Sequence, residues 1–114
     1  MLIFNHMVEY SYQLDSIFAS LADPTRRDII SRVARREYSV GELVAHYDVS
    51  FAAISKHLKV LEEACLIRKR KEGRKHMVSL TPSALKSADE YLQEYRQMWQ
   101  SRYDKLDKVL YEME

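Results

Sequence analysis

The 114-residue sequence is poor in cysteine, glycine and proline, and it has no long apolar run. Its single cysteine, Cys65, excludes an intramolecular disulfide and a zinc site built from several thiolates, so we expect a reducing compartment, the cytoplasm. The longest stretch without Asp, Glu, Lys or Arg is ten residues, His76 to Leu85, whereas a membrane span needs about 20 apolar residues. We therefore expect no membrane segment. Residues 1–10 also lack the basic start and long apolar middle of a secretion signal.

Two glycines and two prolines leave most of the chain free to be helical, with no low-complexity linker and no repeat. They are also too few for a glycine-rich phosphate loop, and the sequence contains neither a nucleophile elbow nor a paired-carboxylate pattern. These absences argue against an enzyme. A chain of this length instead suits one small domain with a single core.

Charge is unevenly divided along the chain. Residues 50–80 hold eight Lys or Arg against three Asp or Glu, whereas residues 1–49 and 81–114 each hold five against seven. A basic middle between two mildly acidic ends can attract a polyanion through one face of a small domain. A merely solvated charged hairpin is the alternative on charge alone.

Helical spacing and capping residues predict the helices of the first half. Apolar residues recur from Leu14 to Leu21, which predicts a helix over 12–22. Asp23-Pro24 combines an N-cap with a first-turn proline and predicts a second helix over 24–36. Ser39 and Glu42 have the spacing of a capping box, which predicts a short helix ending near Tyr47.

A further helix is predicted from the Ser50 cap to Ala64, with Ile54, Leu58 and Leu61 on its core side. The periodicity then changes to that of two strands, 66–71 and 75–80, which flank a turn at Gly73. Six of the nine residues from Arg68 to His76 are Lys or Arg, so this hairpin has a cationic tip.

The last segment is predicted to be one long helix over 82–113, because Thr81-Pro82 opens it and no Gly or Pro interrupts it. An apolar stripe follows its whole length, and a second copy of the chain is the simplest cover for that stripe. A fold-back within one chain is the alternative, and the aromatic zone of the helix has a second possible role as a small-molecule pocket. The expected dimer interface comprises Leu14, Ile17, Phe18, Leu92, Tyr95, Trp99, Leu106 and Leu110.

This order of elements is that of a winged helix-turn-helix, in which one helix enters the DNA major groove and a cationic hairpin reaches the neighbouring backbone. The expected DNA-binding residues have small, hydrogen-bonding or cationic side chains: Ser50, Ala52, Ala53, Ser55, Lys56, His57, Lys59, Arg70, Arg74 and Lys75. Two of these assignments have open alternatives. His57 is equally suited to packing between helices, and simple solubility is a weaker alternative for Lys56 and Lys59.

Two motifs resemble those of the ArsR-type winged helix-turn-helix transcriptional regulators. Leu21-Ala22-Asp23-Pro24-Thr25-Arg26-Arg27 is similar to the family's opening signature, and Ile54-Ser55-Lys56-His57-Leu58-Lys59-Val60-Leu61 is similar to its recognition-helix core. Cys65 stands where the family commonly has glycine. It therefore either adopts a strained helix end or ends the helix differently, and its thiol is either reactive or merely a tolerated or buried cap.

The resemblance implies a homodimer that represses a promoter through a twofold-symmetric operator in double-stranded DNA. It places the chain near the metal-independent branch, because the paired cysteines that metal-responsive members carry after Glu-Leu are absent after Leu43, and residues 82–114 contain no histidine. We therefore expect no metal and no cofactor, and the small-molecule or protein effector is left open.

The predicted fold class is mainly α with a small β-hairpin wing, a winged helix-turn-helix with a long C-terminal dimerisation helix. One domain is expected over 12–114: helix-turn-helix 39–64, wing 66–80, and dimerisation helix 82–113 together with 12–22, with 1–11 as an N-terminal arm. A winged-helix module that binds proteins and has lost DNA binding is the alternative function.

Overall fold

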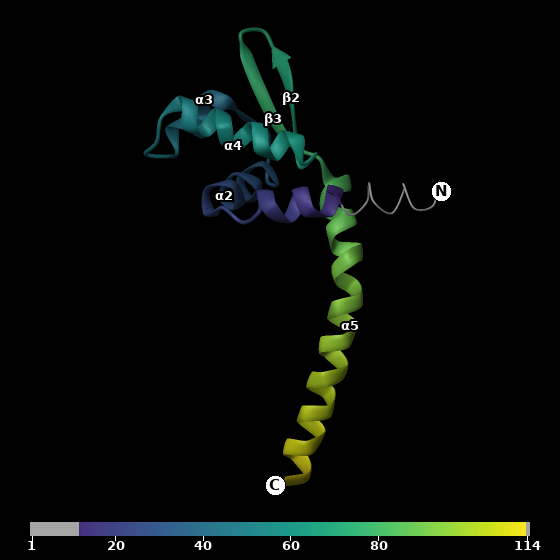
Figure 1. The fold of residues 1–114 in the computed structure, drawn as a ribbon. Coiled ribbons are helices and arrows are strands. Elements are labelled where there is room, and N and C mark those ends of the chain that lie inside the picture. The colour runs from purple at the N-terminus through teal and green to yellow at the C-terminus, as the bar shows by residue number, and fades with distance from the viewer. Residues whose placement is uncertain (1–11, 114) are drawn as a thin grey trace, which may run out of the picture.

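The computed structural model describes residues 12–113, so the expected N-terminal arm lies outside the described residues. Residues 12–20 are helical, and α2 (Pro24–Val33), α3 (Val40–Ala45) and α4 (Phe51–Glu63) follow. After them come strands β2 (Ile67–Glu72) and β3 (Lys75–Leu80) and then helix α5 (Pro82–Met113). Figure 1 shows a head of short helices and a hairpin, from which α5 extends as a rod. The predicted fold class is confirmed.

Capping residues begin the helices where the sequence predicts. The Asp23 carboxylate accepts a hydrogen bond from the Arg26 amide, with Pro24 in the first turn of α2. Ser39 and Glu42 form both halves of the capping box of α3, at 3.0 and 3.1 Å. The pKa of the Glu42 carboxyl is held below its ordinary value, because the charged form accepts hydrogen bonds. The bond from the Ser39 amide has the larger effect and the bond from Arg36 the second largest.

The sheet has one strand that the sequence analysis did not find. Strand β1 (Tyr38–Ser39) pairs with β3, so the antiparallel sheet has the order β1-β3-β2. Tyr38 of this strand is buried and lies opposite Val78. A two-residue strand has too short a pattern to be read from sequence, and its pairing with a strand almost forty residues away is a tertiary event.

The core lies between the helices of the head and the sheet. Its fully covered members are aliphatic and come from each of these elements, among them Ile29, Leu43, Leu58, Leu66 and Val78. Complete burial of one such side chain stabilises the fold by about 1.5–3 kcal/mol. The core therefore fixes α4 from behind and leaves its opposite face free.

Helix α5 contributes little to this core. Only Ala84 and Ala88 of its 32 residues are buried, both near its beginning. At 1.5 Å per residue the helix is about 48 Å long. The rest of α5 therefore projects beyond the head, as Figure 1 shows.

Candidate nucleic-acid interface

Helix α4 separates an apolar face from a face of small and cationic residues. Ile54, Leu58 and Leu61 are buried against the core. Ala52, Lys56 and Lys59 lie on the opposite side and are exposed. The Ser50 hydroxyl accepts the Ala53 amide at 3.1 Å and so caps the beginning of the helix. Ala52 and Ala53, which follow Phe51 in the first turn, are small enough to allow close approach to a DNA groove.

His57 lies on the flank of α4 that faces α2. Its Nδ1 atom is 3.3 Å from a guanidinium nitrogen of Arg26 and 3.7 Å from a carboxylate oxygen of Asp23. These contacts match the helix-packing role that is one of the two alternatives for His57. It is not grouped with Lys56 and Lys59 on the exposed face.

The wing carries its cations on two faces. In the hairpin, Glu72 pairs with Lys75 and Lys69 pairs with Val78. Gly73 in the turn has a φ of 62°, in the left-handed region that favours glycine. Side chains alternate along β2, so Lys69 shares the face of the buried Ile67. Arg70, which we expected to bind DNA, lies on the other face.

Arg70 has two acidic partners within the chain. Its guanidinium nitrogens lie 2.9 Å from Glu37 and 3.0 Å from Glu72. The carboxylates raise the pKa of Arg70 because they stabilise its charged form. Its charge is therefore partly neutralised, unlike that of Lys56, Lys59, Arg74 and Lys75, none of which has an ion-pair partner among residues 12–113.

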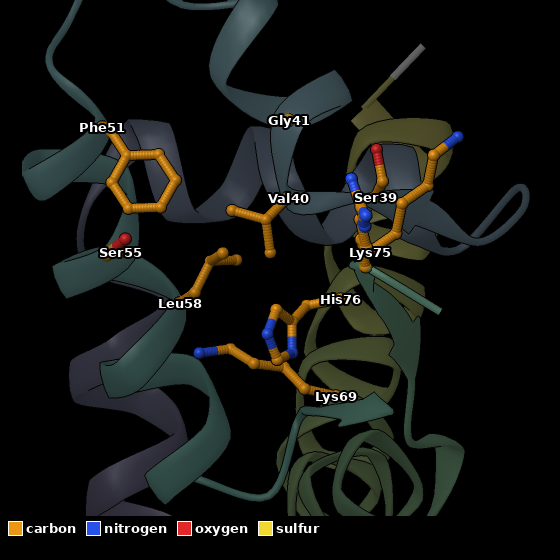
Figure 2. A pocket seen from close by; sticks show the side chains of 10 residues that line it. Ser39, Val40, Gly41, Phe51, Ser55, Leu58, Lys69, Lys75 and His76 are labelled. Carbon is orange, nitrogen blue, oxygen red and sulfur yellow. The ribbon is translucent and has the colours of Figure 1, made fainter. Parts of the chain in front are cut away.

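A concave surface lies between α4, the start of α3 and the wing (Figure 2). The expected DNA-binding residues Ser55, Arg74 and Lys75 line it. The concave surface is also lined by Phe51, Lys69 and His76, which were not predicted from the sequence as site residues. The two-residue period of a strand, counted from the apolar Ile67, is the signal that places Lys69 on this side.

The apolar stripe of α5 is uncovered in the single chain. Its large hydrophobic side chains from Tyr91 to Met113 are exposed, Trp99 to 55% and Leu110 to 53%. Phe18, on the 12–20 helix, lies beside it with its ring centroid 6.0 Å from that of Tyr91. Trp99 and Tyr103 stack at 5.9 Å.

Two expected interface residues do not contribute to this surface. Ile17 is fully buried and Leu14 is 6% exposed, because both face the inside of the subunit. Helical periodicity identifies the apolar side of the 12–20 helix but does not say whether its own chain or a partner covers it. Phe18, the next residue along the helix, is exposed, as is Tyr12 at the start of the segment.

Cys65 follows α4 with a φ of 61°, so it does adopt the conformation that favours glycine. The Cys65 amide donates to the carbonyl of Glu62 and the Leu66 amide donates to that of Leu61, the hydrogen bonds of a Schellman motif. The thiol is exposed, which contradicts the buried alternative. Of the two alternatives for the backbone, Cys65 therefore adopts the strained helix end.

Residues 12–113 contain neither a candidate metal site nor a candidate membrane span. No three His, Cys, Asp or Glu side chains gather there as potential metal ligands. None of the described helices is long and apolar enough to span a bilayer.

An α4 with a free cationic face, braced by α3 and flanked by a basic hairpin, defines a winged helix-turn-helix protein. Residues 23–69 match the model of the bacterial regulatory protein arsR family. A crystal structure of an ArsR family transcriptional regulator has a TM-score of 0.73 and 33% identity, over 80% of this chain and 94% of that one. The chain belongs to the ArsR family.

Two curated relatives agree with this assignment. The HTH-type transcriptional regulator Rv2034 of Mycobacterium tuberculosis is 42% identical over 71 residues, 62% of this chain and 66% of that protein. The transcriptional repressor SdpR of Bacillus subtilis is 28% identical over 75 residues, 66% of this chain and 83% of that protein. The protein is therefore a DNA-binding transcriptional regulator, and the prediction that it is not an enzyme is confirmed.

Proposed function

We propose that the protein is a homodimeric repressor that reads a twofold-symmetric operator. The observation that carries this proposal is the exposed face of α4, where Lys56 and Lys59 have no carboxylate partner among the described residues and face away from the core. In this reading α4 enters the major groove, and Ala52 and Ala53 allow close approach to the bases. Ser50 and Ser55 donate hydrogen bonds there.

The wing supplies the second contact of each subunit. Arg74 and Lys75 stand at its tip and bind the phosphate backbone beside the groove that α4 occupies. Arg70 contributes less, because Glu37 and Glu72 already neutralise part of its charge. His57 acts from behind, by holding α4 against α2.

A second copy of the chain covers the apolar stripe of α5. Leu92, Tyr95, Trp99, Leu106 and Leu110 are exposed along one side of the helix, and Phe18 continues the surface onto the 12–20 helix. A twofold contact lets this same patch satisfy itself. The dimer then sets its two α4 helices about one DNA turn apart, roughly 34 Å, for successive half-sites.

Repression follows when the bound dimer occludes a promoter. The relative SdpR is named a transcriptional repressor, which supports repression rather than activation. The cytoplasm is the compartment in which such a protein meets DNA.

Operator selection from random duplexes, followed by titration of the selected site, tests the proposal. The double variant Lys56→Glu, Lys59→Glu should lose at least a hundredfold in affinity and stay dimeric, because two phosphate or base contacts become repulsive. The control Lys86→Glu, Lys108→Glu makes the same charge change on α5 and should bind almost as the parent does.

The salt dependence of binding separates DNA recognition from the alternative of a protein-binding module. Affinity for the selected duplex should fall steeply with salt, since bound cations displace counterions from the phosphates. A flat salt response, or unchanged affinity in the α4 double variant, favours the protein-binding module. Failure to enrich any twofold site contradicts the dimeric operator.

A further inference from the structure

The concave surface between α4 and the wing is large enough to hold a small molecule. Its volume is about 580 Å³, within the range of roughly 300–1,000 Å³ that is usual for ligand sites. Three elements enclose it: the beginning of α3, one flank of α4, and the inner face of the hairpin, as Figure 2 shows.

One side of this cavity is apolar. Val40 from α3 and Leu58 and Phe51 from α4 point toward the same space (Figure 2). Leu58 is fully covered and forms part of the floor, whereas Phe51 is 62% exposed. A phenyl ring so open to water loses hydrophobic free energy that an apolar ligand can recover.

The other side of the cavity is cationic. Lys69, Arg74, Lys75 and His76 of the wing line it, and none of the residues around it is acidic. In Figure 2 the Lys69 side chain extends across the lower edge of the cavity toward α4. Lys69, Arg74 and Lys75 have no carboxylate within ion-pair distance among residues 12–113, so their charge is not balanced by the described chain.

DNA accounts for only part of this lining. Phosphate groups match the basic side chains, but they offer nothing apolar to Val40 and Phe51. The lining as a whole is complementary to a molecule that has an anionic group at one end and a compact apolar body at the other.

We propose that this cavity binds a small organic anion, an aromatic or branched carboxylate or sulfonate. The anionic group pairs with Lys69 and its neighbours on the wing, and the apolar body lies against Val40 and Phe51, over the covered Leu58. The site lies on the head of the subunit, apart from the exposed stripe of α5.

Such a ligand acts as an effector by competing directly with operator DNA. This inference rests on the proposed function. Ser55, Arg74 and Lys75 are shared between the cavity and the DNA-binding surface. A bound anion neutralises the wing and occupies the space beside α4, so the ligand and the operator exclude each other. By linkage, each lowers the affinity of the other by the same factor.

Methyl NMR of the full chain without DNA tests the binding step, with 2-naphthoate as the probe and the uncharged 2-naphthamide as its matched control. We expect 2-naphthoate to shift the methyl signals of Val40 and Leu58 and leave those of Leu110 in place. The amide should bind about tenfold more weakly, since it lacks the charge-assisted contact. Unshifted Val40 and Leu58 signals at millimolar probe, or equal affinity of the two probes, overturn the proposal.

A pair of variants on β2 locates the anionic end. Lys69→Gln should weaken 2-naphthoate binding about tenfold, whereas Arg68→Gln makes the same charge change on the opposite face of the strand and should leave it unchanged. Equal effects of the two substitutions overturn the assignment, because they indicate only a general attraction to a basic wing. The NMR spectrum of each variant verifies that it is folded.

Operator titration with and without 2-naphthoate tests the competition separately. Operator affinity should fall with probe concentration in the parent and respond about tenfold less in Lys69→Gln. Affinity that does not change with saturating probe overturns the competition. Absence of operator binding before any probe is added contradicts the proposed function instead.

Discussion

Arg26 of α2 contacts His57 of α4, with 3.3 Å between the guanidinium Nη1 and the imidazole Nδ1. The same guanidinium donates to the carbonyl oxygens of Ser20 at 2.6 Å and Ala19 at 3.2 Å, at the end of the 12–20 helix. One side chain thus joins three helices. It connects the helix that we expect to read DNA with a helix that borders the proposed dimer surface.

Arg26→Met should lower the free energy of unfolding by about 2 kcal/mol, because two helix-end carbonyls lose a charged donor. Urea unfolding measures the loss. The control Arg27→Met removes one exposed hydrogen bond, from Arg27 to the Leu21 carbonyl, and should change stability by about 0.5 kcal/mol or less. Equal losses for the two variants contradict a joining role for Arg26.

Cys65→Gly should stabilise the protein by about 1 kcal/mol, because glycine adopts the observed positive φ without the clash of a β-carbon. Thermal unfolding should show a midpoint several degrees higher. Cys65→Ala keeps the β-carbon and serves as the control, with stability close to that of the parent. A rise in Cys65→Ala equal to that in Cys65→Gly means that the thiol, rather than the backbone, causes the strain.

Tyr47→Phe should remove about 0.5–1 kcal/mol of stability at neutral pH, a modest loss because the pair is partly exposed. The Tyr47 hydroxyl donates a hydrogen bond to the Asp28 carboxylate at 2.5 Å. This hydrogen bond is the main cause of the lowered pKa of Asp28, and the hydrogen bond from Arg32 is the second. A carboxyl with a depressed folded-state pKa adds stability above its unfolded value and loses it as the pH falls through the folded value.

Unfolding at pH 7 and pH 3 measures this effect, since the difference between Tyr47→Phe and the parent should shrink at the lower pH. NMR titration should also show the pKa of Asp28 rising toward its ordinary value of 3.8 in the variant. In the parent, the pKa of Tyr47 is raised to about 12, mainly because the side chain is partly buried and secondly because it donates a hydrogen bond to Asp28. Tyr111→Phe, at an exposed position, is the control and should leave Asp28 unchanged.

Leu106→Glu should convert the dimer to a monomer at micromolar concentration, because it places a charge in the centre of the apolar stripe of α5. Sedimentation equilibrium measures the change, and operator affinity should fall with it. Ser101→Glu adds the same charge on the opposite side of the helix and should leave the dimer intact. A parent protein that sediments as a monomer rules the dimer out.

Local signals determined which segments are helical and where they begin. The Asp23, Ser39 and Ser50 caps act within three residues of their own positions, so they can be read without the rest of the fold. Gly73 marks the hairpin turn for the same reason. The C-terminal ends of the helices were predicted less accurately: α2 ends at Val33, three residues before its predicted end.

The candidate site was predictable in part. The exposed cations Lys56 and Lys59 follow from helical periodicity once Ile54 and Leu58 are known to be buried. The roles of Arg70 and His57 did not follow, because Glu37 and Arg26, their partners, lie about thirty residues away in the sequence. Ion pairs between distant segments leave no periodic pattern.

The sequence by itself therefore determined the helices, the cationic hairpin and the uncovered stripe of α5, because each depends on residues that are neighbours along the chain. Only the tertiary structure decided that Ile17 faces inward, that β1 completes the sheet, and that Val40, Phe51 and Lys69 surround one cavity. These features depend on which segments meet in space, and that outcome is set by the packing of the whole core.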